Sequence, residues 1–386
     1  MTANLLGDTH QEIGRQLSIR ALPRHGYLFA GWVGDVVSAE NPLFFVMSDG
    51  MTLQATFVSS PFINCQGRFY GIFESSAPET NGSWQLQMNA YGRFTGTFVT
   101  NGKRRVVSGA LDAAAHWSKT FGDGVRISFE QDLQTGHATG TLEVANMVAQ
   151  FSGDKLPTFS NENPLQFAGA YPLVFHTTAN NSETPLPRGL GYAALRVTSK
   201  GIARFMGRLS DGVSMNVAVP ITSENVIPVS TSLSRGYIHG IGKFPVQDAG
   251  NDLEGSFAWR RISDSAWPGG FSATLEIVAS RWNKPSHGQR LLSAMDANNG
   301  IANVLLDAGD SVVHTTIVLD PHNLALENPP SPCALKLSVS PNMGTFRGNF
   351  LDAQFQKRAF RGVFLQRQMR GEGYFLDGAV AVTPAE

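Results

Sequence analysis

The stretch from Trp84 to Phe98 reads WQLQMNAYGRFTGTF, and it contains the pattern from which we predict the fold. Apolar and polar side chains alternate from Trp84 to Ala90, as in a strand with one buried and one solvated face. Gly92 then marks a turn, and Phe94 opens a second strand-like segment. Period-two alternation interrupted by glycine predicts antiparallel strands joined by tight turns.

The same arrangement recurs along the chain. We interpret the copies over residues 84–111, 193–212 and 335–365 each as strand, glycine turn, strand, hairpin turn and strand. Recurrence of this kind predicts a fold built from repeated β-meanders.

Two glycine signals refine this prediction. Asn101-Gly102 and Asp211-Gly212 predict two-residue hairpin turns. Gly96 and Gly348 fall inside strand patterns, which predicts a bulge or a close backbone approach at those positions.

Composition agrees with an all-β class. Apolar residues make up 42% of the 386 residues, 25 of them Phe, whereas charged residues make up only 16%. No long amphipathic helical stretch is present, so we predict antiparallel β-barrel or sandwich domains. The net charge of −1 offers no concentrated basic face, which argues against a nucleic-acid partner. No apolar run reaches membrane-spanning length.

The chain is too long for one ordinary domain. We place boundaries near residues 59 and 160, the latter at the connector 156–164 with its prolines and polar residues. The expected domains are 1–59, 60–160 and 161–386, with a softer division near residue 284.

The first domain carries a distinct motif. Residues 26–35 read GYLFAGWVGD, residues 41–43 read NPL, and a closing segment follows at 52–57. The apolar side chains expected to fill its small core are Tyr27, Phe29, Trp32, Leu43, Phe45 and Phe57.

Over residues 9–58 this pattern resembles the divergent InlB B-repeat, a small β module. The resemblance implies a tandem or spacer module of a large bacterial surface or secreted protein, and not an enzyme. The later repeats, with FRGVFLQ at 360–366 and GEGYFL at 371–376, resemble β-rich modules of uncharacterised large secreted bacterial proteins. That second resemblance implies no activity.

Sequence motifs for catalysis are absent. The chain has no G-x-S-x-G elbow, no H-E-x-x-H and no C-x-x-C. Glu130 and Asp132 lie two residues apart on one expected strand face, about 7 Å between their Cα atoms, whereas paired glycosidase carboxylates usually come from different strands. We therefore predict no catalytic residues and no cofactor.

Binding candidates are few. Trp267, in a loop, and Tyr70 are the aromatic side chains that we single out for stacking on a ligand. Oxygen ligands alternate at Asp248, Asp252 and Glu254 around Gly250, which leaves a structural calcium site open, although the spacing differs from an EF-hand. His314, Asp320 and His322 form the tightest group of nitrogen and oxygen ligands, and we interpret it as a polar strand end.

Location and function follow from the resemblance. We expect a secreted or cell-surface protein with an extracellular glycan or protein partner, whose non-catalytic role is structural, adhesive or in assembly. Because no signal peptide follows Met1, this expectation requires that the chain is a fragment or that Met1 is not the natural start. A carbohydrate-binding module of a larger secreted enzyme is the alternative, and a hydrolase on a β scaffold is the second. Whether Cys65 and Cys333 pair stays open.

Overall fold

The computed structural model describes residues 2–3, 11–75, 81–100, 102–145, 147–180, 185–245, 250–376 and 378–385. The chain forms two compact units. The first comprises residues 1–80, 84–99 and 104–155, and the second comprises residues 81–83, 100–103 and 156–386. Almost all regular structure in the described part is antiparallel β-sheet, so the all-β prediction is confirmed.

The first unit begins with the small module. Its strands are β1 (Thr2–Ala3), β2 (Gln16–Ile19), β3 (Ala21–Leu22), β4 (Tyr27–Gly34), β5 (Leu43–Val46) and β6 (Leu53–Ser59). They pair as β1–β3, β2–β5 and β4–β6. The register of β4 shifts between Phe29 and Gly31, and Gly31 takes a φ of +154° there, as expected for a bulge.

The core of this module is close to the one predicted. Trp32 and Leu43 are buried, and Phe29, Phe45 and Phe57 pack against them. Tyr27 is an exception, because its side chain is exposed. It is the first residue of β4 and lies opposite Ser59, the last residue of β6, at the end of the ladder.

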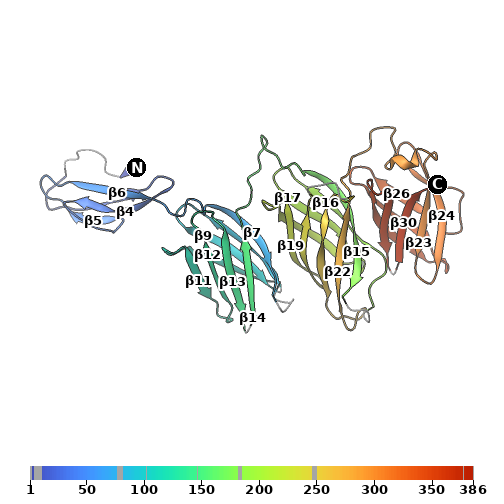
Figure 1. The fold of residues 1–386 in the computed structure, drawn as a ribbon, viewed down its shortest axis with the longest axis horizontal. Helices are drawn as coiled ribbons and strands as arrows, with labels where there is room; N and C mark the ends of the chain where they lie inside the picture. The colour runs from blue at the N-terminus through green and yellow to red at the C-terminus, as the bar shows by residue number, and fades with distance from the viewer. Residues whose placement is uncertain are drawn as a thin grey trace. The chain divides into compact units, whose positions relative to one another are not determined.

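The rest of the first unit is an eight-stranded meander in two four-stranded sheets (Figure 1). One sheet contains β7 (Gly67–Phe73), β8 (Gly82–Met88), β9 (Arg93–Thr100) and β10 (Lys103–Ala110), and the other contains β11 (His116–Thr120), β12 (Arg126–Gln131), β13 (Ala138–Val144) and β14 (Met147–Gly153). Isolated bridges from Phe69 to Lys155 and from Glu74 to Gln150 join β7 to the β14 side.

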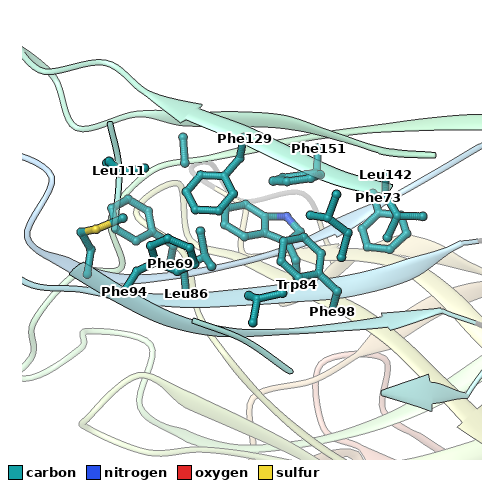
Figure 2. Close-up of a cluster of buried hydrophobic side chains, with 14 of the residues drawn as sticks. Phe69, Phe73, Trp84, Leu86, Phe94, Phe98, Leu111, Phe129, Leu142 and Phe151 are labelled. Atoms are coloured by element: carbon teal, nitrogen blue, oxygen red, sulfur yellow. The ribbon is translucent and has the colours of Figure 1, made fainter. Parts of the chain in front are cut away.

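Aromatic rings fill the space between these two sheets. Figure 2 shows side chains of both sheets pointing toward one another. Phe151 lies with its ring centroid 5.0 Å from that of Trp84 and 5.2 Å from that of Phe98. Phe129 and Phe94 meet edge-to-face at 4.9 Å, a favoured aromatic geometry.

The second unit contains two further eight-stranded sheets, each nearly closed on itself. The first sheet contains β15 (Gly169–Ala179), β16 (Gly191–Val197), β17 (Ile202–Arg208), β18 (Ser214–Pro220), β19 (Val226–Leu233), β20 (Gly236–Lys243), β21 (Glu254–Arg261) and β22 (Phe271–Ala279). The second contains β23 (Ile301–Asp307), β24 (Val312–Leu319), β25 (Ala325–Glu327), β26 (Lys336–Ser340), β27 (Thr345–Leu351), β28 (Lys357–Leu365), β29 (Arg370–Phe375) and β30 (Gly378–Pro384).

All three meanders share one strand order. In the sheet β18-β17-β16-β15-β22-β21-β20-β19 and in the sheet β25-β24-β23-β30-β29-β28-β27-β26, the first and last strands of the run in sequence pair with each other. The repeat unit is therefore an eight-stranded up-and-down meander. Residues 84–111 and 193–212 both start at the second strand of a meander. Residues 335–365 cover the fourth to sixth strands, so the third predicted copy is displaced by two strands.

The interiors of the two nearly closed sheets are filled with side chains. Phe175, Phe205 and Phe257 have 0% exposure in the first, and Phe364 and Val382 have 0% exposure in the second. A void large enough for water would expose the side chains around it. Eight-stranded barrels are just wide enough to be filled in this way or to hold one small ligand.

Candidate functional site

An open groove lies on the outer face of the sheet β11–β14. Its volume is about 570 Å³, within the usual range for ligand sites. Beneath it, Phe73, Phe129 and Phe151 form its floor and belong to the core. Its polar side chains come from β11 to β14 and from the residue that follows β7: Glu74, His116, Ser128, Glu130, Thr139, Thr141, Gln150 and Ser152.

The strand register arranges these side chains in two rows. In the first row, His116 lies opposite Glu130, which lies opposite Thr139, which lies opposite Ser152. Successive side chains along a strand alternate between faces, so residues two apart share this outer face. The second row is therefore parallel to the first and contains Ser128, Thr141, Gln150 and Glu74.

The inward residues of the same strands explain why polar side chains alternate regularly on this outer face. Ile127, Phe129 and Leu142 are buried between the outward polar positions. Gly140 lies between Phe129 and Phe151 in the ladder, and a Cβ there would collide with the Phe151 ring and the carbonyl oxygen of Ser128. The missing side chain lets both rings pack under the groove.

Hydrogen bonds already order part of the face. The hydroxyls of Ser128 and Thr141 lie 3.0 Å apart, and the Thr139 hydroxyl donates to Glu130 Oε1 at 3.3 Å. The lining side chains that the structure describes include two carboxylates, one imidazole and no Lys or Arg. The groove is therefore a hydrogen-bonding surface of neutral to acidic character.

The imidazole that lines the groove belongs to His116. His116 Nδ1 is 3.9 Å from Asp112 Oδ2, beyond hydrogen-bond range, and both side chains are largely exposed. Asp132 does not continue the face of Glu130 as predicted, because β12 ends at Gln131 and Asp132 begins a turn. Its Oδ1 accepts the backbone N–H groups of Thr135 and Gln134, and these bonds hold the pKa of Asp132 below its ordinary value.

Neither of the two aromatic candidates is among the residues that line this groove. Trp267 is half-buried and packs edge-to-face on Phe271, with ring centroids 5.1 Å apart. Its backbone N–H donates to Asp264, so the loop around it is ordered by local bonds. Tyr70 is half-buried on β7. Tyr70 belongs to the first unit and Trp267 to the second.

The structure describes two of the three acidic residues considered as calcium ligands, and their surroundings differ. Asp248 lies outside the described residues. Asp252 Oδ2 accepts the backbone N–H of Arg281, and its Oδ1 accepts from the Arg367 guanidinium at 2.6 Å. Glu254 is exposed on β21. Among the described residues no group of three His, Cys, Asp or Glu side chains could hold a metal ion. The calcium site stays a prediction.

The histidine group has a local structural explanation. Asp320 Oδ1 accepts the backbone N–H groups of His322 and Leu324, which orders the turn after β24. His314 is exposed on β24, five residues before the strand ends. Asp320 and His322 therefore follow the end of the strand, whereas His314 lies within it.

Both cysteines are buried and free. Burial raises the pKa of each thiol. Cys333 lies beside Ser331 and the Glu327 carboxylate, which also accepts from Thr315 and from the backbone N–H of Leu335. β25 and β26 are the two edge strands of their sheet, and no strand ladder pairs them. The bonds from Glu327 on β25 to Cys333 and Leu335, which precede β26, therefore connect the two edges.

The groove itself was missed by sequence reasoning. The polar alternation of β12–β14 is visible in the sequence, but which residues stand opposite each other depends on register. One residue of slippage would move every side chain to the other face.

Comparison with known proteins gives no family and no function. No family model matches the chain, and no curated protein matches it. Among solved structures, one similar chain is a protein of unknown function from the DUF3598 family of Nostoc punctiforme PCC 73102. It is 12% identical, covers 57% of this chain and 97% of its own length, and has a TM-score of 0.16. In the described residues, no helix is both long and apolar enough to cross a membrane.

Proposed function

We propose that this chain is a non-catalytic structural, adhesive or assembly segment of a secreted or cell-surface bacterial protein. The observation that carries the proposal is that apolar side chains fill the interiors of the meanders. The rings at their centres are fully packed, and the His116 imidazole of the groove on β11–β14 lies beyond hydrogen-bond range of the Asp112 carboxylate. The resemblance of residues 9–58 to the InlB B-repeat adds the surface location.

Surface labelling tests this proposal. Antibodies against the purified chain should bind intact cells of the producing organism or detect the protein in the culture medium. Limited protease treatment of intact cells should remove the cell-bound signal while a cytosolic marker stays intact. Detection in the cytosol alone would contradict the proposal.

A carbohydrate-binding role is the second candidate, and the groove favours it. Ser, Thr and Gln side chains in two rows present both donors and acceptors. Stacking of aromatic side chains on sugar rings would contribute less to such a role. Trp259 and Trp282 are buried, and Trp267 packs on Phe271. A hydrolase on this scaffold has weaker support, since Asp112 accepts from the backbone N–H of His116, while the His116 imidazole lies 3.9 Å from that carboxylate, beyond hydrogen-bond range.

A further inference from the structure

We propose that the groove on the outer face of β11–β14 binds a saccharide chain that is neutral or carries amino groups. This inference rests on the proposed non-catalytic function and adds to it a binding site and a ligand class. It depends on the placement of Ser128, Glu130, Thr139 and Thr141, and on the absence of cations from the described lining.

The geometry favours an extended ligand. Neighbouring strands lie about 4.8 Å apart, and outward residues on one strand repeat about every 6.8 Å. The two rows therefore form a grid that crosses all four strands of the sheet and reaches Glu74. A ligand that carries hydrogen-bonding groups at regular intervals along its length can contact many points of this grid.

The chemistry of the grid favours hydroxyl groups on the ligand. Ser and Thr hydroxyls and the Gln150 amide can each donate and accept, whereas carboxylates accept only. Sugar hydroxyls also do both. An apolar ligand would remove these groups from water without replacing their hydrogen bonds, which is unfavourable.

Charge narrows the class further. Glu74 and Glu130 contribute two carboxylates, and no Lys or Arg lines the described groove. An anionic saccharide would meet like charge from the carboxylates of this lining. Ammonium groups on the sugar would find carboxylate acceptors, so amino sugars should bind best.

The aromatic rings of this region do not act as stacking platforms. Phe129 and Phe151 lie under the grid and are at most 4% exposed. Recognition therefore depends on hydrogen bonds to the outward side chains, and removal of those bonds should remove binding.

Calorimetric titration of the full chain with three hexasaccharides tests the proposal. The ligands are the hexamers of glucosamine, glucose in β-1,4 linkage and galacturonic acid. We expect the glucosamine hexamer to bind at least tenfold more tightly than the galacturonic acid hexamer, with the glucose hexamer between them. Binding of none of them, or of the anionic hexamer best, would overturn the proposal.

Two groove variants and one control locate the site. Thr139→Val with Thr141→Val keeps the shape of the side chains and removes two hydroxyls, which should weaken binding about tenfold or more. Glu130→Gln should reduce the preference for the glucosamine hexamer over the glucose hexamer. Thr95→Val is the matched control, because Thr95 is exposed on β9 in the same Thr-Gly-Thr context and does not line the groove. Equal binding by the groove variants and the control would contradict the assignment of the site.

Mass spectrometry of the titrated hexamers separates this inference from the proposed function. Intact hexamers with groove-dependent binding support both. Cleaved hexamers would refute the non-catalytic function while groove-dependent binding stands. Intact hexamers without binding would refute the groove inference alone.

Discussion

Single residues with positive φ set the turns of all three meanders. Among the described residues, eight hairpins have a three-residue loop closed by the same two backbone bonds. At residues 209–213, for example, the Leu209 N–H donates to the Val213 carbonyl and the Gly212 N–H donates to the Leu209 carbonyl. This is a type I turn followed by a left-handed residue. The left-handed residues are Gly92, Ala115, Gly124, Gly201, Gly212, Asn225, Asn323 and Phe355. The Asp211-Gly212 turn is therefore a three-residue loop and not the predicted two-residue turn, because Gly212 occupies the bulge position after the turn.

Substitutions at two of these positions should have opposite effects. Gly212→Ala places a side chain at φ +82° with nothing near its Cβ, so only backbone strain acts, and we expect a loss of about 1 kcal/mol. Phe355→Gly relieves an exposed residue at φ +58° and should gain a similar amount. Urea unfolding measures both. Gly269→Ala, with open space and no positive φ, is the control and should be near neutral.

A buried ion pair should matter more than an exposed one. Arg261 and Asp211 form an ion pair with side-chain exposures of 1% and 0%, and Arg261 also bonds Asp264 at 2.7 Å. Arg261→Met would leave Asp211 buried and uncompensated, at a cost of about 3–5 kcal/mol. Arg358→Met, which removes the more exposed pair with Asp352, should cost about 0–1 kcal/mol in the same unfolding experiment.

The pH dependence of the Arg261→Met variant checks this cause. Burial raises the pKa of Asp211, although Arg261 opposes the shift. Without Arg261 the shift should increase, so the folded variant takes up a proton more readily than the unfolded chain. Its stability deficit should therefore shrink as the pH falls through the raised folded pKa toward the ordinary value. A deficit that stays constant with pH would contradict an uncompensated Asp211 charge.

At the scale of elements, strand glycines make room for rings. The ladder β26–β27–β28 runs through Gly348 without a register shift, and a Cβ there would collide with the Phe360 ring and the Lys336 carbonyl. Of the two alternatives predicted for Gly348, the structure shows the close approach and not the bulge.

Gly348→Ala should therefore destabilise the second unit by about 1–3 kcal/mol through overpacking. Phe360→Leu in the same chain should recover part of that loss, because it removes one of the two colliding groups. A double-mutant cycle measures the coupling, which is expected to be favourable between the two substitutions. Independent, additive effects would show that the ring does not occupy the Cβ position.

The sequence patterns predicted where strands occur better than they predicted which strands pair with each other. The alternation from Trp84 to Ala90 became β8 with Trp84, Leu86 and Met88 buried, because this pattern depends only on local side-chain direction. The third repeat copy was placed two strands away from its counterparts, because strand and turn motifs look alike at each step of a meander. The sequence does not predict the groove residues Thr139 and Gln150 for a related reason, since only the strand register places them on one face.

For the whole molecule, we conclude that side chains fill the interiors of the meanders. An eight-stranded barrel can instead enclose one small apolar ligand, so strand number alone does not decide between the two. The complete burial of Phe175, Phe205 and Phe257 favours a filled interior in β15–β22. The complete burial of Phe364 and Val382 favours it in β23–β30.

Titration of the native chain with the fluorescent fatty acid cis-parinaric acid tests this claim most directly. A filled interior has no room for the acyl chain. We therefore predict only a weak, non-saturable rise in fluorescence, of the same size for the folded and the unfolded chain. Saturable binding near one fatty acid per meander would contradict the account, because it would require a hollow interior and a carrier function.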